Sequence, residues 1–308
     1  MEVTCPRDRC ALTREEDELV CTAGHRYPVV DGIPVLLVEE DVPTHGACWV
    51  SLERSAQQTD TDAFVQGAIA ATCGHLYRHL IGNLPAYPIP EIRLPTGDGK
   101  LFLEIGCNWG RWCVSAARRG YRVVGIDPSL DAIRAARRVA DELGVDAEYL
   151  VADARHLPFT DSSFDVVFSY SVFQHFTRAS AVAGFEELGR VLKPSGLSLV
   201  QMANAWGIRS LFNQLRERRF REPRTLFDVR YWSPRELRRE LDRAVGPTEL
   251  SVDGFLTLNP QPADLPLLPR RYRALVRLSE AYRATSRRLP WLVQAADSVY
   301  AASRRTPF

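Results

Sequence analysis

The sequence has almost no lysine. Lys100 and Lys193 are the only two, and every other basic residue is an arginine. A guanidinium fork can recognise phosphates or carboxylates, which would point to acidic partners. However, the formal net charge is only +1 and the arginines are spread along the chain rather than clustered. This pattern favours a compositional bias of the solvated surface.

Long hydrophobic runs are also missing. The first ten residues, MEVTCPRDRC, lack the apolar core of a signal peptide, and no apolar run approaches the roughly 20 residues of a membrane span. We therefore expect a cytoplasmic protein. In such a reducing compartment, the seven cysteines favour metal ligands or buried thiols over disulfides.

The central stretch, residues 101–127, reads LFLEIGCNWGRWCVSAARRGYRVVGID. Its apolar run at 101–105 predicts a strand buried on both faces, and a glycine-bounded turn follows at 106–110. Helical spacing then continues until Gly120, and a second apolar strand ends in Asp127. The stretch therefore predicts a strand, a tight turn, a helix and a strand ending in an acid.

This arrangement suits a ribose-bearing cofactor bound at the carboxyl ends of parallel strands. Gly106 lets the main chain pass close to a ligand, Gly110 lets the helix start near the strand, and Asp127 can accept both ribose hydroxyls. A dinucleotide would use the same logic, but the G-x-x-x-G spacing lacks the glycine that lets a pyrophosphate approach, and Glu104 would repel a diphosphate. A positively charged cofactor, such as S-adenosylmethionine with its ammonium and sulfonium groups, fits better.

Four segments in the same order resemble the class I S-adenosylmethionine-dependent methyltransferases, in particular the type 11 and type 25 domains. They are EIGCNWG at 104–110, GIDPS at 125–129, VADARHLPFTDSSFDVVFSYSVFQHF at 151–176 and RVLKPSGLSLV at 190–200. The resemblance covers about Leu101 to Met202. It implies an α/β fold, a Rossmann-like doubly wound sheet of seven strands, with S-adenosyl-L-homocysteine as the product of the cofactor.

The resemblance also implies a cofactor site at the strand ends. In this family an acid after the third strand accepts from the adenine amino group, and the next main-chain amide faces the ring; Asp153 holds that position here. The implied cofactor residues are Glu104, Gly106, Cys107, Asn108, Gly110, Asp127, Pro128, Asp153, Ala154, Arg155, Ser169 and Tyr170.

In this family the end of the fourth strand faces the transferred methyl group. Methyl transfer is an in-line displacement, so a base is needed only if the attacking atom must lose a proton early. His175 is the candidate general base, and the alternative is that it only shapes the pocket. The candidate acceptor-binding residues are Tyr77, Tyr170, Gln174, His175, Asn204, Trp206 and Tyr231. The chain lacks the Asn/Asp-Pro-Pro-Tyr/Phe signature that holds a flipped base, so an exocyclic base amine is a poor acceptor.

The N-terminal segment predicts a structural metal site. Cys5, Cys10, Cys21 and His25 offer three sulfurs and one imidazole for a tetrahedral Zn²⁺ ion. The segment resembles the short zinc ribbon that precedes some methyltransferase domains, although its C-x4-C spacing departs from the commoner C-x2-C. The alternative is a metal-free relic that packs on the next domain.

We divide the chain into four parts: a zinc-ribbon-like segment at 1–40, a helical lid and linker at 41–100, a methyltransferase domain at 101–260, and a helical tail at 261–308. Within the third part, residues 204–232 resemble a substrate-cover insertion. The tail predicts two basic amphipathic helices, at 270–288 and 291–305, which either pack on the domain or rest on an anionic membrane surface.

We expect S-adenosylmethionine-dependent methyl transfer to a small-molecule acceptor at oxygen, nitrogen or carbon. A natural product, a lipid-linked compound or a sugar-type metabolite would fit. One alternative is an rRNA or tRNA methyltransferase that uses the ribbon to bind RNA, although the ribbon is acidic between Glu15 and Glu18. A second is a non-catalytic partner protein that binds the cofactor.

Overall fold

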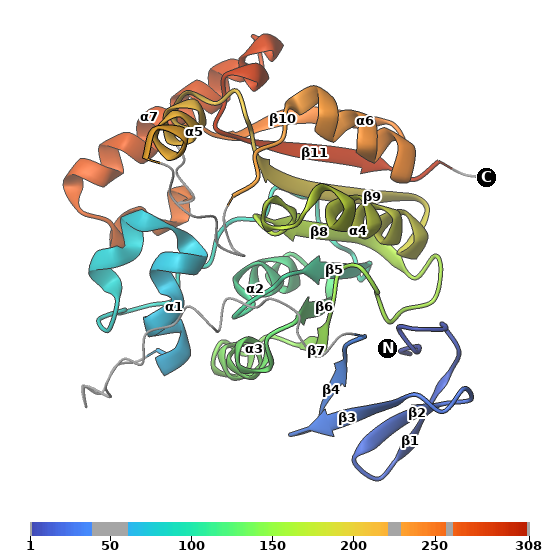
Figure 1. Ribbon diagram of the computed structural model, residues 1–308. Helices are drawn as coiled ribbons and strands as arrows, with labels where there is room; N and C mark the ends of the chain where they lie inside the picture. The colour runs from blue at the N-terminus through green and yellow to red at the C-terminus, as the bar shows by residue number, and fades with distance from the viewer. Residues whose placement is uncertain (1, 39–60, 221–228, 257–260, 307–308) are drawn as a thin grey trace.

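The computed structural model describes residues 2–38, 61–220, 229–256 and 261–306 (Figure 1). The first third of the predicted lid, residues 41–60, and part of the predicted cover insertion, residues 221–228, lie outside the described residues. Within the described part, no helix has both the length and the apolar character needed to cross a bilayer.

The described chain forms one mixed sheet of 11 strands in the order β1-β2-β3-β4-β7-β6-β5-β8-β9-β11-β10. The strands are β1 Leu12–Glu15, β2 Glu18–Cys21, β3 Arg26–Val30, β4 Ile33–Leu36, β5 Leu101–Ile105, β6 Arg122–Asp127, β7 Ala147–Ala152, β8 Phe164–Tyr170, β9 Leu192–Ala203, β10 Thr248–Gly254 and β11 Ser298–Arg304. The pairs from β4 to β9 are parallel, and β11 is antiparallel to both of its neighbours.

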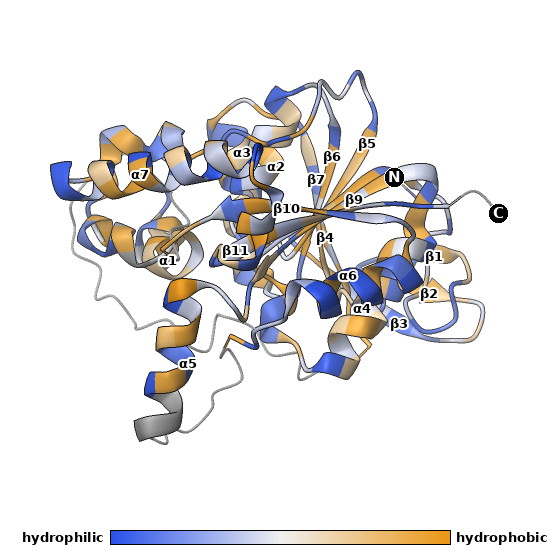
Figure 2. Ribbon diagram, turned by 90° about the horizontal axis from the view of Figure 1, so that it is seen from above, coloured by the Kyte–Doolittle hydropathy of each residue, from blue (hydrophilic) through white to orange (hydrophobic). Residues whose placement is uncertain are grey.

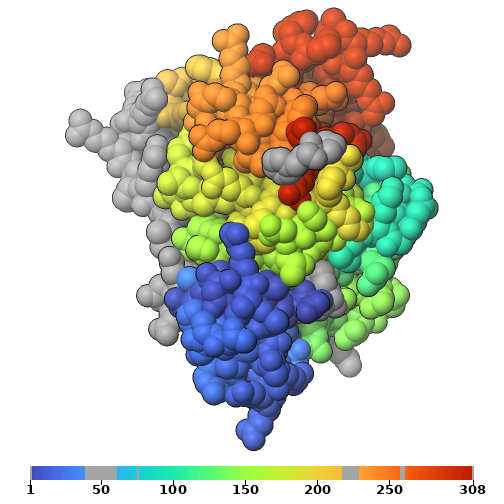
Figure 3. Space-filling view, turned by 90° about the vertical axis from the view of Figure 1, so that its right-hand side faces the viewer, coloured from blue at the N-terminus to red at the C-terminus, as the bar shows by residue number. Residues whose placement is uncertain are grey.

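The predicted count of seven strands is therefore wrong for the whole sheet, although β5 to β11 form a continuous block of seven within it. The extra strands come from the N-terminal segment, because β4 pairs in parallel with β7 and brings Val35 opposite Val151. Tyr27 and Leu36 also belong to the same buried cluster as the central strands. The segment at 1–40 thus continues the sheet at one end of the molecule, as Figure 3 shows in blue, rather than forming a core of its own.

The predicted helical tail is only partly correct. The second predicted helix, at 291–305, is replaced by a short 3-10 turn, η5 (Pro290–Gln294), and by β11, which lies between β9 and β10. Val299, Tyr300 and Ala301 are buried there, so the pairing covers apolar surface on both faces of the sheet. The sheet of the methyltransferase-like fold therefore does not end at residue 260.

Helices cover both faces of the sheet (Figure 1). Apolar residues of α2 (Arg111–Arg118) and α3 (Leu130–Glu142) pack on one face, and those of α4 (Arg178–Val191) and α6 (Pro234–Ala244) pack on the other. A further layer over α2 and α3 contains α1 (Ala63–Cys73), η2 (His75–Leu80), η4 (Pro262–Leu267) and α7 (Arg270–Ser286). The remaining helical elements are η3 (Phe173–His175) and α5 (Ile208–Phe220).

Side-chain caps explain where several helices begin. Ser129, Thr177 and Ser233 each accept a hydrogen bond from a backbone amide in the first turn of α3, α4 and α6. Helical spacing in the sequence predicts helices at 130–143, 208–220 and 234–245, and the structure confirms them to within one residue. The same spacing predicts a helix at 64–84, which is confirmed only in its first half, because Gly74 takes a φ of 105° and η2 follows.

Candidate functional site

The turn between β5 and α2 has the left-handed backbone that its sequence requires. Gly106, Asn108 and Gly110 have φ values of 69°, 49° and 79°. A Cβ on Gly106 would lie 2.3 Å from Val172 Cγ2, and one on Gly110 would lie 2.7 Å from the Tyr149 hydroxyl. Val172 therefore packs directly against the Cα of Gly106. The missing side chain of Gly110 allows Tyr149 of β7 to approach the start of α2 closely.

Asp127 ends β6 beside this turn and is almost completely buried. Its Oδ2 accepts a hydrogen bond from the Asn108 amide at 3.0 Å, and its Oδ1 accepts one from the Ser129 amide at 2.9 Å. Burial raises its pKa to about 6, and the two amide hydrogen bonds limit the rise. The carboxylate therefore orders the turn and keeps further lone pairs for a ligand. Pro128, between Asp127 and Ser129, is half-buried.

Glu104 precedes the turn, but its side chain is buried beneath it against Cys113 rather than open to the crevice. Burial raises its pKa to about 8, so the group holds its proton at neutral pH. The cofactor role of Glu104 remains a prediction. Cys107, also predicted at the cofactor site, is buried with its Sγ 3.6 Å from the Asn108 carbonyl oxygen.

Asp153 follows β7, and the parallel pairing of β7, β6 and β5 brings it to the same edge of the sheet as Asp127. Its Oδ1 accepts from the Arg155 amide at 2.9 Å, and its Oδ2 accepts from Arg155 Nε at 2.8 Å. Asp153 and Ala154 are both buried. The adenine role of Asp153 remains a prediction, and a ligand there would share the carboxylate with the Arg155 guanidinium.

Ser169 and Tyr170 end β8 on opposite faces of the sheet. Ser169 is fully buried, and the Tyr170 ring packs against the Trp112 ring at a tilt of 37°, with ring centroids 4.8 Å apart. The Tyr170 hydroxyl donates to Asp253 Oδ2 at 3.1 Å. Tyr170 was predicted to contact both cofactor and acceptor, but its polar end is instead used to join β8 to β10.

Asp253 organises a buried network that the sequence did not reveal. Besides Tyr170, its carboxylate accepts from Gln201 Nε2 at 3.1 Å, from Ser298 Oγ at 2.9 Å and from Arg93 Nη1 at 3.1 Å. These partners come from four segments far apart in the chain, so no local motif marks them. The strand at 248–254 contains both Glu249 and Asp253, so the local sequence does not single out Asp253.

Arg111 is a second residue that sequence reasoning missed. It begins α2 directly after the turn, and it is buried although it carries a charge. Among the described residues its Nε and Nη2 atoms have no hydrogen-bond partner, and Nη2 lies 3.6 Å from Asp264 Oδ2 of η4. The signal available was an arginine within the apolar surroundings of EIGCNWGRW. An under-coordinated guanidinium beside the turn is suited to a carboxylate ligand.

The predicted lid forms hydrogen bonds to two residues near Arg111, namely Asp264 of η4 and Trp109 of the turn. Tyr77, a predicted acceptor residue, is fully buried, and its hydroxyl donates a short hydrogen bond to Asp264. Trp109 of the turn donates from Nε1 to Thr72 Oγ1 of α1 at 3.0 Å. Tyr77 therefore links the lid to η4 and does not face an open acceptor pocket.

The segment after β8 lies against the segment at 229–232. The Gln174 side chain accepts from the Ala203 amide at 3.1 Å, and its carbonyl accepts from the Arg230 amide at 2.7 Å. His175 is half-buried with its Nε2 3.4 Å from Gln174 Nε2. Gln174 and His175 thus lie at the edge where β8 and β9 end. Half-buried Tyr231 follows Arg230, the residue whose amide binds Gln174.

Two other predicted acceptor residues, Asn204 and Trp206, follow the end of β9. Asn204 is fully buried, and its amide donates to the carbonyls of Val293, Gln294 and Ala296. The acceptor role predicted for Asn204 is therefore replaced by a structural one. Trp206 is 56% exposed.

The comparisons with known proteins agree with this arrangement of strand ends. Residues 102–196 match the family model described as a methyltransferase domain. The chain contains that domain's sequence pattern. The match spans β5 to the start of β9, so it includes Asp127, Asp153 and the Gly106 turn.

The methyltransferase match extends to curated proteins. A ubiquinone biosynthesis O-methyltransferase of Chelativorans sp. is 36% identical over 107 residues, which cover 35% of this chain and 42% of that protein. A biotin biosynthesis bifunctional protein of Cellvibrio japonicus is 30% identical over 165 residues, which cover 51% of this chain and 29% of that protein. The chain thus spans less than half the length of these relatives. A solved S-adenosylmethionine-dependent methyltransferase of Methanosarcina mazei shares 19% identity at a TM-score of 0.49, over 68% of this chain and 94% of that one.

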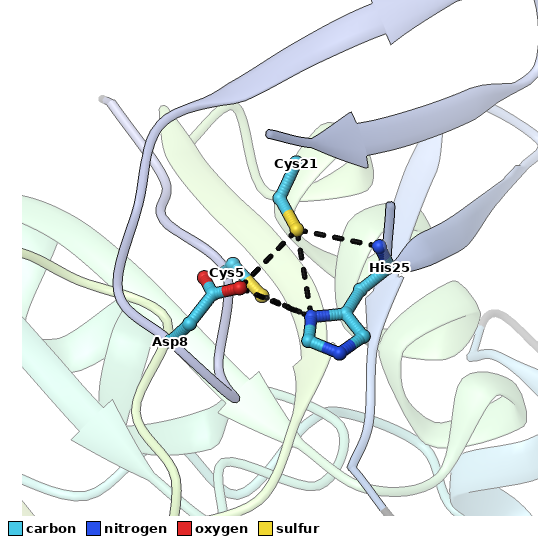
Figure 4. A group of neighbouring side chains, drawn as sticks. All are labelled: Cys5, Asp8, Cys21 and His25. Atoms are coloured by element: carbon cyan, nitrogen blue, oxygen red, sulfur yellow. Dashed lines mark hydrogen bonds and ion pairs between the residues drawn. The ribbon is translucent and has the colours of Figure 1, made fainter. Parts of the chain in front are cut away.

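Outside the methyltransferase match, the N-terminal segment places four potential metal ligands together (Figure 4). They are Cys5, Asp8, Cys21 and His25, whose ligand atoms all lie within 4.8 Å of one another. His25 Nδ1 is 3.5 Å from both Cys5 Sγ and Cys21 Sγ and 3.1 Å from Asp8 Oδ2.

The predicted ligand Cys10 is not a member of this group. The chain reverses at Arg9, which has a φ of 62°, and the Cys10 amide donates to Asp8 Oδ1 at 3.2 Å. This turn brings the Asp8 carboxylate beside the imidazole, and the Cys10 side chain forms a hydrogen bond to that carboxylate. Hydrogen bonds from Cys10 and Cys5 hold the pKa of Asp8 well below its ordinary value.

Proposed function

We propose that this protein transfers a methyl group from S-adenosylmethionine to a small-molecule acceptor at oxygen, nitrogen or carbon. The observation that carries the proposal is the position of Asp127, a buried acid at a parallel strand end whose carboxylate binds the amide of the glycine turn inside the methyltransferase match. The names of the curated relatives refer to small-molecule biosynthesis, which favours a small acceptor such as a natural product, a lipid-linked compound or a sugar-type metabolite.

Different residues would bind different parts of the cofactor. Asp127 would accept the ribose hydroxyls, and Asp153 with the Ala154 amide would hold the adenine. Arg111 would bind the methionyl carboxylate, because its buried guanidinium keeps unused donors. When bound, the sulfonium supplies an electrophilic methyl group, and a cation near the turn also favours the ionised form of Glu104.

At the acceptor side, His175 would accept the proton of an attacking hydroxyl or amine at Nε2 once the acceptor displaces the Gln174 side-chain amide, which otherwise donates to that nitrogen. Held by Asp127, Asp153 and Arg111, the cofactor would supply the methyl carbon for a bond to the acceptor atom, and its sulfur would keep the electron pair of the broken carbon–sulfur bond as a neutral thioether. Trp206 and Tyr231 would contact the acceptor body.

We also propose that the N-terminal group holds one structural Zn²⁺ ion. Zinc bonds of about 2.0–2.3 Å in a tetrahedron put ligand atoms roughly 3.3–3.8 Å apart. The two separations from His25 Nδ1 to the sulfurs of Cys5 and Cys21, 3.5 Å each, lie within that range, and the 3.1 Å separation from Asp8 Oδ2 is slightly shorter. Cys5, Cys21 and His25 would be three ligands and Asp8 the fourth, and Cys10 competes for the last position.

We expect elemental analysis of protein purified without chelator to find about one zinc per chain, and protein without zinc would support the metal-free relic.

The decisive experiment is transfer of labelled methyl from S-adenosylmethionine into fractionated cell extract, with small metabolites, lipids and RNA separated. Label in a small metabolite or lipid would support the proposal. Label in RNA would support the RNA alternative, against which stand the exposed acids at residues 15–17 of the ribbon. Binding of cofactor without any label would support the non-catalytic alternative.

A matched pair of variants separates cofactor binding from folding. Asp127→Ala should lose affinity for S-adenosylmethionine by calorimetry while the circular dichroism spectrum is retained. Asp146→Ala, at an exposed position before β7, should leave both unchanged. Unchanged affinity in Asp127→Ala would remove the central assignment. The predicted cytoplasmic location remains a prediction.

A further inference from the structure

Helix α5 is oriented with its apolar face outward. Ile208, Leu211, Phe212 and Leu215 recur at helical spacing, so they form one stripe, and each is between 40% and 64% exposed. The same helix turns polar residues towards the body of the protein: Ser210 is buried, and Asn213 and Gln214 are half-buried. In Figure 2 the helix projects away from the sheet with apolar segments along its length.

The orientation is determined by hydrogen bonds at the start of α5. Asp297 Oδ1 accepts from the amides of Arg209 and Ser210 at 2.8 and 3.0 Å, and Gln214 Nε2 donates to the Ala205 carbonyl at 2.9 Å. A Cβ on Gly207 would lie 2.5 Å from the Asp297 Cα, so the chain can enter the helix only in this close contact. These contacts fix the rotation of α5 about its axis, and the apolar stripe therefore faces outward.

The surroundings of the stripe are aromatic and basic. Exposed Trp206 precedes the helix, and exposed Trp291 lies in η5, the segment whose carbonyls bind the Asn204 side chain next to Trp206. The sequence of α5 contains four arginines and a single glutamate. Arg209 and Arg216 are exposed, and at 100° per residue they lie about 90° around the helix from the centre of the stripe.

We propose that Trp206 and the α5 stripe, here called the α5 patch, bind the surface of an anionic lipid membrane. The apolar side chains would enter the acyl boundary, the tryptophans would lie at the headgroup level, and the arginines would pair with lipid phosphates. A symmetric contact between two copies fits less well, because it would bring the same arginines of both copies together. This proposal replaces the acceptor contact proposed above for Trp206; the α5 stripe itself lies outside the cofactor and acceptor residues, so the proposal does not depend on the proposed function.

The test uses the full chain and vesicles of phosphatidylcholine, with and without an equal part of phosphatidylglycerol. We expect sedimentation with the anionic vesicles and much weaker sedimentation with the neutral ones. Phe212→Ser should lower the partition coefficient at least about tenfold, since it removes a large inserted side chain. Ile81→Ser, at an exposed apolar position outside the patch, should have no effect.

A second matched pair of variants tests the contribution of the arginine charges to vesicle binding. Arg216→Gln should weaken binding to anionic vesicles and reduce its salt dependence, whereas Arg235→Gln, exposed on α6, should not. Leu215→Ser provides a second apolar variant if Phe212→Ser is poorly folded. Equal binding by the wild type and both apolar variants, or no binding to anionic vesicles, would overturn the proposal. A dimer in light scattering that Phe212→Ser dissociates, without vesicle binding, would assign the patch to contact between copies.

Discussion

Replacing Glu104 by glutamine should change how the stability of the protein depends on pH. The carboxyl group is buried beneath the glycine turn, and burial raises its pKa from 4.5 to about 8. The folded protein therefore holds this proton more tightly than the unfolded chain does. Its contribution to stability is complete below the unfolded pKa and is lost as the pH rises towards the folded pKa.

The magnitude follows from the two pKa values. Between about pH 5 and about pH 8 the wild-type protein should lose roughly 3.5 kcal/mol of unfolding free energy through this one group. Glutamine keeps the shape of the side chain and can still accept a hydrogen bond from Cys113, but it does not titrate. The loss should therefore be absent in Glu104→Gln, and the variant should be the more stable protein on the alkaline side.

The assay is denaturant unfolding of both proteins at about pH 5 and about pH 8, without cofactor. Asp127, whose pKa is raised to about 6, titrates in both proteins and cancels in the comparison. Glu148→Gln, at an exposed position on β7, is the matched control and should follow the wild type. If the wild type and Glu104→Gln lose the same free energy over this pH interval, the reasoning about the buried carboxyl is refuted.

Three further perturbations test packing and chemistry. Gly189→Ala should destabilise the fold by about 1–3 kcal/mol, because the new Cβ would lie 2.1 Å from the Ala244 carbonyl oxygen, and an unchanged denaturation midpoint would contradict that contact. Asp253→Asn should cost about 3–5 kcal/mol, since the Arg93 charge loses its buried partner; stability within error of the wild type would count against the network. His175→Gln should lower kcat about 10²–10⁴-fold with cofactor affinity unchanged, and a full kcat would leave His175 as a pocket residue.

Local sequence patterns predicted the elements around the turn well. β5 occupies the predicted residues, and β6 ends at the predicted Asp127, because short apolar runs bounded by glycine leave little choice of structure. Asp127 is predicted from its place at the end of such a strand, whereas the role of Asp153 is implied by the family resemblance.

The errors concern long-range pairing. The segment SVYAASR looks helical by its alanine and arginine content, yet its neighbours β9 and β10 make it a strand. Nothing near β4 in the sequence indicates its pairing with β7. Arg111 meets Asp264 only through the fold. Asp8, rather than Cys10, lies in the group of potential metal ligands because of a left-handed turn at Arg9.

The position of β11 also constrains the order in which the protein can assemble during synthesis. Its partners β9 and β10 are complete when residue 254 leaves the ribosome. β9 can then pair with β8, but its other edge and β10 lack their partner until residues 298–304 emerge. Through that interval β9 presents an unpaired edge, and premature pairing of β9 with β10 would have to be undone. The stretch at 261–294 thus delays completion of the sheet, and a nascent chain halted within it would present one edge of β9 without its partner β11.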